Sequence, residues 1–187
     1  LNYIKTSADN GYSKAMLFYS KILKEKNDKK SANTYLKKAA YDGNVEAMHE
    51  YALLLNSSNN LNLKREALNL FKKSGDKGNA DSIFQYGLLM KYINKPASTM
   101  IDSTLLRSPT FVRNNTKAIY SDTEANKYLK FAALAGNVDA MEPYAEILYT
   151  ISQLHKTDDS ESKMFFKMAA DHGNPIAMRH YANTLAN

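Results

Sequence analysis

The sequence predicts an all-α fold made of about five helix-turn-helix repeats. The first indication is a set of five glycines, each followed eight positions later by a tyrosine. The second is that small and apolar residues recur at offsets of three and four on both sides of these glycines, as on one face of an α-helix. The third is that no window alternates polar and apolar residues for long enough to predict a β-strand. The repeated positions are Gly11, Gly43, Gly78, Gly136 and Gly173, with Tyr19, Tyr51, Tyr86, Tyr144 and Tyr181.

Each of these glycines is expected to end one helix and to begin the turn into the next. A residue just past a helix end often takes a positive φ, which costs a residue with a Cβ roughly 1 kcal/mol and costs glycine little. Small residues flank every glycine at fixed offsets, so two helices can pack closely as a hairpin. The predicted units cover about residues 1–24, 31–56, 63–91, 121–150 and 160–187 of a single array that spans 1–187.

One interval between glycines is longer than the others and predicts an insertion. The spacings are 32, 35, 58 and 37 residues. The surplus falls between Lys91 and Tyr120, where Pro96 and Pro109 occur and periodic apolar positions are scarce. We therefore expect an irregular, basic insertion at about 92–120.

Three stretches of the chain resemble Sel-one-like repeats, which are relatives of the tetratricopeptide repeat. They are AAYDGNVEAMHEYALLL from Ala39, AALAGNVDAMEPYAEIL from Ala132 and AADHGNPIAMRHYANTL from Ala169. The first and third units match less well, because Ser or Gly replaces part of the alanine. The resemblance implies a right-handed α-solenoid that acts as a protein-binding adaptor, and it supplies no catalytic residue. Secreted bacterial members often carry a cysteine pair in each repeat, and this chain has none.

The composition excludes several kinds of site. The 187 residues contain no cysteine, so a thiolate metal site, a disulfide framework and a cysteine nucleophile are ruled out. The four histidines lack the three- or four-residue spacing of a two-ligand site on a helix, and no glycine-rich phosphate loop or GxSxG elbow occurs. We therefore expect no catalytic residue, no metal, no cofactor and no enzymatic activity.

The charge pattern bears on the class of partner. The formal net charge is +6, and the excess is concentrated from Lys21 to Lys38 and from Lys91 to Lys117. Arginine and interleaved aromatic residues are too few in these segments to predict a nucleic-acid surface. No window approaches the roughly 20 apolar residues of a membrane-spanning helix. We expect protein or peptide partners, without nucleic acid and without a membrane span.

Two sets of residues are candidates for partner binding. A lysine stands six positions before every glycine, and these lysines are expected on one flank of the first helices, near the superhelical groove. There they could attract an acidic or phosphorylated segment, or they could simply solubilise the surface while their aliphatic stems cover the edge of the core. The lysines are Lys5, Lys37, Lys72, Lys130 and Lys167. Tyr3, Tyr35 and Tyr128 are candidate aromatic anchors, whereas the tyrosines that follow the glycines are expected in the core.

These observations predict a non-enzymatic scaffold or adaptor that binds partner proteins through its groove and its basic insertion. The alternatives are a lumenal, substrate-recruiting subunit of an ER-associated ubiquitin-ligase complex and a regulatory region of a larger signalling enzyme. The lack of cysteine favours the cytoplasm. The sequons at Asn56 and Asn114 keep the ER lumen open as an alternative, although the Asn and Ser/Thr content would give such matches by accident.

Overall fold

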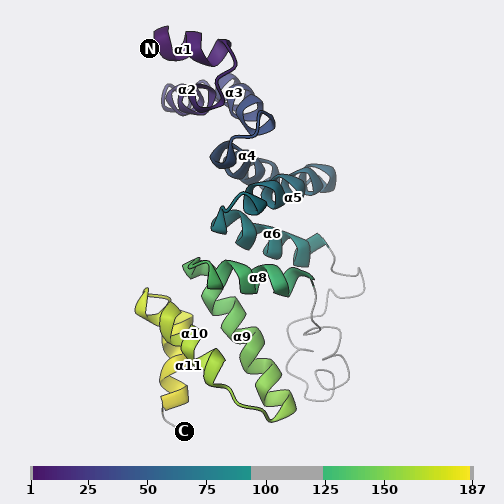
Figure 1. Cartoon of the computed structure of the whole chain (residues 1–187), viewed down its shortest axis with the longest axis vertical. Coiled ribbons are helices and arrows are strands. Elements are labelled where there is room, and N and C mark those ends of the chain that lie inside the picture. The colour runs from purple at the N-terminus through teal and green to yellow at the C-terminus, as the bar shows by residue number, and fades with distance from the viewer. Residues whose placement is uncertain (1, 94–123, 186–187) are drawn as a thin grey trace. The chain divides into compact units, whose positions relative to one another are not determined.

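The structure, a computed structural model, describes residues 2–93 and 124–185. Within those ranges the chain forms α-helices joined by short turns and contains no β-strand (Figure 1). The predicted all-α fold is confirmed. The helices are α1 (Asn2–Asp9), α2 (Ser13–Glu25), α3 (Lys29–Tyr41), α4 (Val45–Asn56), α5 (Leu61–Asp76), α6 (Ala80–Ile93), α8 (Glu124–Leu134), α9 (Val138–His155), α10 (Ser160–Asp171) and α11 (Pro175–Leu185).

Each hairpin turns on the repeated glycine, which takes a φ between 87° and 95° in all five hairpins. In the second hairpin the Gly43 amide donates to the Ala40 carbonyl, and the next amide donates to the Ala39 carbonyl. This is the Schellman arrangement, in which the turn satisfies carbonyls that the helix end leaves unpaired. The same two hydrogen bonds recur at the other four glycines.

The residue after the glycine begins the second helix of the hairpin. In four of the five hairpins it is an asparagine whose side-chain oxygen accepts a hydrogen bond from the backbone amide three residues on, at 2.7–2.9 Å. Such an N-cap satisfies one of the free amides of a helix start. The first hairpin differs, because Tyr12 stands at that position and makes no side-chain cap. Two adjacent residues, glycine and asparagine, thus end one helix and start the next.

The repeated positions also build the core. In the second, fourth and fifth hairpins, the alanines four residues before and four residues after the glycine are completely buried. Seven residues before the glycine stand Phe71, Leu129 and Phe166, which likewise expose no surface. Fully burying one such side chain contributes about 1.5–3 kcal/mol. The alanines keep the two helices of a hairpin close, and the larger residues fill the space between consecutive hairpins.

By its internal contacts the chain divides into two compact units, Leu1–Gln85 and Tyr86–Asn187. In the first unit α1 packs on α2, α2 on α3, α3 on α4 and α4 on α5. In the second unit α8 packs on α9, α9 on α10 and α10 on α11. Packing between consecutive helices is typical of repeat proteins, whose stability is roughly a sum of local terms. Among the helices of the described ranges, none has both the length and the apolar character needed to cross a bilayer.

Candidate protein-binding grooves

A groove of about 760 Å³ in the first unit is lined by residues of α2, α3 and α4; we call it the α2–α4 groove. Apolar surface comes from Leu36, Leu53 and Leu54. Leu53 and Leu54 are neighbours on α4, and each exposes 40% of its surface. The lining residues are Ser20, Lys21, Lys24, Glu25, Lys29, Ala32, Asn33, Leu36, Glu50, Leu53 and Leu54.

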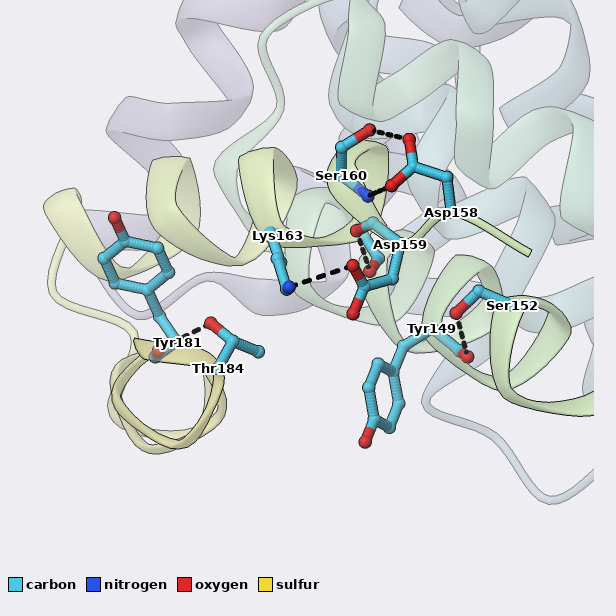
Figure 2. A network of polar contacts seen from close by, with 9 residues as sticks. Tyr149, Ser152, Asp158, Asp159, Ser160, Lys163, Tyr181 and Thr184 are labelled. Carbon is cyan, nitrogen blue, oxygen red and sulfur yellow. Dashed lines mark hydrogen bonds and ion pairs between the residues drawn. The ribbon is translucent and has the colours of Figure 1, made fainter. Parts of the chain in front are cut away.

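The second unit contains a groove of about 370 Å³ between α9, α10 and α11, which we call the α9–α11 groove. Figure 2 shows the Lys163 ammonium directed at the Asp159 carboxylate, with Tyr149 from α9 and Thr184 from α11 close by. The lysine and the carboxylate are 3.0 Å apart. The lining residues are Tyr149, Gln153, Asp159, Lys163, Phe166, His180, Asn183 and Thr184.

The two grooves are formed by the same positions of the repeat. Lys24 lies 13 residues after Gly11, and Tyr149 lies 13 residues after Gly136. Seven lining positions coincide in this way when they are counted from the glycine of their own hairpin. The equivalent pairs are Lys24 and Tyr149, Lys29 and Asp159, Asn33 and Lys163, Leu36 and Phe166, Glu50 and His180, Leu53 and Asn183, and Leu54 and Thr184.

Comparison with known proteins bears on the fold. No protein-family model matches the sequence, and no curated protein does. Two solved structures match 96% of the chain. One is c5321 of uropathogenic Escherichia coli, a protective antigen displaying an SLR fold, with a TM-score of 0.66 and 18% identity. The other is a Sel1 repeat protein from Oxalobacter formigenes, with a TM-score of 0.65 and 17% identity.

This chain has the Sel1-like repeat fold. The resemblance drawn from the glycine and tyrosine spacing is therefore confirmed at the level of the fold. The chain spans 35% of the length of the first solved structure and 64% of the second.

In the α2–α4 groove, one lysine is neutralised and two are not. Lys21 contacts Glu46 at 2.5 Å and Glu50 at 3.2 Å, and the hydrogen bond to Glu46 is the main reason why the pKa of Lys21 is raised. Within the described part of the chain, Lys24 and Lys29 have no ion pair, and both are exposed. The rim of the groove therefore presents two free ammonium groups beside exposed leucines.

The α9–α11 groove has a different electrostatic character. Asp159 and Lys163 neutralise each other, and the His180 ring stacks on Phe166 with centroids 4.8 Å apart and planes within 6°. His180 Nε2 lies 3.7 Å from Glu146 of α9, and burial raises the pKa of Glu142, four residues earlier on the same helix. This surface offers the Tyr149 and His180 rings, amides and hydroxyls. Phe166 also lines the groove but exposes no surface of its own.

The lysines six positions before the repeat glycines lie on the first helices and line neither groove. In three hairpins the lysine bonds an aspartate four residues later on the same helix: Lys5 with Asp9 at 2.6 Å, Lys72 with Asp76 at 3.0 Å and Lys167 with Asp171 at 2.8 Å. Those carboxylates offset the charge that a partner would feel.

The other two lysines of the series differ from these. Lys37 sits over the Tyr41 ring, 5.8 Å from its centroid, and Lys130 is exposed with no ion pair among the described residues. An electrostatic track along this flank stays a prediction.

Two of the three candidate aromatic anchors, Tyr35 and Tyr128, pack between consecutive hairpins. Tyr35 meets Tyr19 edge to face with centroids 4.9 Å apart, and its hydroxyl donates to Asp9 at 2.5 Å. Tyr128 meets Tyr86 edge to face at 4.4 Å. Both are half-buried, so their rings already contact the preceding hairpin, and a role in binding partners also stays a prediction.

Of the tyrosines that follow the repeat glycines, four are buried and Tyr181 is half-buried. The predicted insertion at 92–120 lies outside the described residues, apart from Tyr92 and Ile93 at the end of α6.

A buried polar chain in the first unit was not predicted from the sequence. The Ser74 hydroxyl donates to the Val45 carbonyl at 2.9 Å, the Ser82 hydroxyl donates to Ser74 at 2.9 Å, and His49 Nδ1 lies 2.8 Å from Ser82. Ser74 and Ser82 expose no surface. They stand at the repeat positions that hold alanine in the second, fourth and fifth hairpins. The sequence signal for this chain is the replacement of alanine by serine in the third unit, which is also why that unit matches the repeat less well.

Proposed function

We propose that the chain is a non-enzymatic scaffold that binds segments of partner proteins in the α2–α4 and α9–α11 grooves. The observation that supports the proposal best is that one set of repeat positions forms both grooves but carries different side chains in each. The packing positions four residues before and after the glycine, and seven residues before it, hold small or apolar residues in every hairpin, whereas the other lining positions change from lysine and leucine to aspartate, asparagine and threonine. That division is typical of a repeat scaffold whose surface determines its partners.

The size and shape of the grooves fit a peptide segment. Volumes of about 370 and 760 Å³ lie in the range of pockets that hold a few side chains. In the α2–α4 groove, half-exposed leucines lie beside polar groups, as in grooves that receive an extended or helical segment of another protein.

Site-specific photocrosslinking tests the proposal. A benzoylphenylalanine would replace Leu54 in one groove or Asn183 in the other, and the matched controls would carry it at Lys14 and Arg179, exposed positions of α2 and α11 that line neither groove. In the native cells we expect discrete protein adducts from the groove positions and few from the controls. Equal labelling from groove and control positions would contradict the proposal.

A further inference from the structure

We propose that the α2–α4 groove binds a short peptide segment that combines apolar side chains with carboxylates. The inference rests on the proposed function and narrows it to one groove and one partner chemistry. Its grounds are the exposed leucines, the two free lysines and the contrast with the equivalent groove of the second unit.

The apolar part of the partner is indicated by Leu53 and Leu54. Both lie on the C-terminal half of α4 and face the groove, where Leu36 of α3 adds to the same surface. At the equivalent positions the α9–α11 groove has Asn183 and Thr184, so the repeat does not need leucine there for packing. Covering each leucine with a partner side chain removes apolar surface from water and favours binding.

The acidic part of the partner is indicated by Lys24 and Lys29. Lys24 is in the last turn of α2 and Lys29 is the first residue of α3, so the turn between these helices carries both. Glu25 also lines the groove, which leaves one more free lysine than free carboxylate on the rim.

The surrounding segment strengthens this positive potential, since residues 21–38 contain seven lysines, one aspartate and one glutamate. Such a field attracts an anionic segment and disfavours a cationic one.

The matching positions of the second unit supply substitutions that the fold already accepts. The rim pair, Lys24→Tyr with Lys29→Asp, gives the α2–α4 groove the residues that the α9–α11 groove has at these two positions. The floor pair, Leu53→Asn with Leu54→Thr, does the same for the two exposed leucines. A charge-matched control is Lys26→Tyr with Lys30→Asp. It changes two exposed lysines of the same turn that do not line the groove.

The test is a selection of random twelve-residue peptides displayed on phage against the immobilised whole chain. It is followed by fluorescence anisotropy of the enriched peptides with each variant. We expect enrichment of leucine, methionine or phenylalanine together with aspartate and glutamate. The rim pair and the floor pair should each weaken binding on the order of tenfold, the control pair should weaken it much less, and added salt should weaken the wild-type complex.

The possible failures separate the two levels of the proposal. Peptides that lose binding with the floor pair, but are basic or uncharged or insensitive to the rim pair, would overturn the acidic-partner inference and leave the groove as a binding site. No enrichment would overturn both levels. Enriched peptides whose affinity is changed by neither the rim pair nor the floor pair bind elsewhere on the chain, and they would overturn the inference for the α2–α4 groove.

Discussion

At the scale of single residues, the hairpin turn depends on a backbone conformation that glycine adopts at low cost. Gly136 has a φ of 87°, and a Cβ built there would meet no atom within 4 Å. A side chain at this position therefore fits sterically, and the penalty comes from the left-handed backbone alone.

We predict that Gly136→Val lowers the free energy of unfolding by about 1–2 kcal/mol. Thermal unfolding measures the effect, and Ala135→Val, an exposed neighbour with a negative φ, is the control, expected to change stability by less than about 0.5 kcal/mol. An unchanged melting temperature for the glycine variant would show that the turn does not depend on this conformation.

The buried serine chain fixes the proton of His49. The Ser74 hydroxyl donates its one hydrogen to the Val45 carbonyl, and the Ser82 hydroxyl donates its one hydrogen to Ser74. Ser82 can therefore only accept a hydrogen bond from His49. Neutral His49 must then carry its proton on Nδ1. Burial also lowers the pKa of His49, which keeps the ring neutral near pH 7.

We predict that nitrogen NMR of His49 shows the Nδ1–H tautomer at neutral pH. In Ser74→Ala, the Ser82 hydroxyl loses its acceptor and can turn toward the imidazole, so the proton should move to Nε2. An Nε2–H tautomer in the unaltered chain would refute the hydrogen-bond direction deduced here.

The environment of Glu142 predicts that the stability of the fold depends on pH. Burial, followed by the charge of Glu146, raises its pKa above the ordinary value of 4.5. A carboxyl whose pKa is higher in the folded state adds stability below its ordinary pKa, and that stability is lost as the pH rises through the folded value. Ionised Glu142 is therefore a destabilising residue at neutral pH.

We predict that Glu142→Gln raises the melting temperature at pH 7 and leaves it nearly unchanged at pH 4, where the wild-type carboxyl is largely protonated. Thermal unfolding at the two pH values measures the difference. A gain of the same size at both would mean that the effect comes from packing instead of ionisation.

The residue spacing predicted which repeat positions lie in the core. It did not predict the role of positions whose residue type varies between hairpins. The glycines were found because one backbone conformation recurs and favours one residue. Asparagine follows four of these glycines with the same regularity. The capping role of these Gly-Asn pairs was not predicted, although asparagine is a common N-cap residue. The serine chain was harder to foresee, because two serines at alanine positions form a network only if a histidine of another helix reaches them.

At the scale of helices, consecutive hairpins are joined by aromatic contacts. The tyrosine of one second helix meets an aromatic residue on the next first helix edge to face in three places: Tyr19 with Tyr35, Tyr86 with Tyr128, and Tyr144 with Phe165. In each pair, the first residue lies eight positions after one repeat glycine and the second lies eight positions before the next repeat glycine. Tyr3 occupies the same position on α1, has no preceding hairpin among the described residues and is 92% exposed.

We predict that a double-mutant cycle of Tyr19→Leu and Tyr35→Leu gives a coupling energy of about 0.5–1.5 kcal/mol. The reason is that the edge-to-face contact exists only when both rings are present. Urea unfolding of the four proteins measures it. Additive losses would indicate that the rings contribute through burial alone.

The helices themselves were largely predictable, but the place of the tyrosines was only partly so. A period of three and four fixes which face of a helix is apolar. It does not predict that the residue eight positions before one repeat glycine contacts the tyrosine eight positions after the preceding repeat glycine, because that contact depends on how the hairpins stack. Tyr35 and Tyr128 therefore look from the sequence like surface anchors, and in the structure they lie at junctions.

At the scale of the whole molecule, packing positions repeat and groove positions vary. Leu54 and Thr184 occupy one repeat position, as do Lys29 and Asp159, so a search for identical residues at fixed spacing passes over them. The regular lysine series, by contrast, is evident from its spacing, and it lines neither groove. The positions that differ between repeats are the ones available for recognising different partners.

The central claim is that the grooves, rather than the lysine-bearing flank of the first helices, are the recognition surface. The most direct test is backbone NMR of the chain, titrated with a peptide selected against it. We predict that amide shifts cluster at the positions lining the α2–α4 groove, with Leu36, Lys29 and Leu54 among the most affected. Shifts concentrated around Lys5, Lys37 and Lys72, with the groove unchanged, would contradict it.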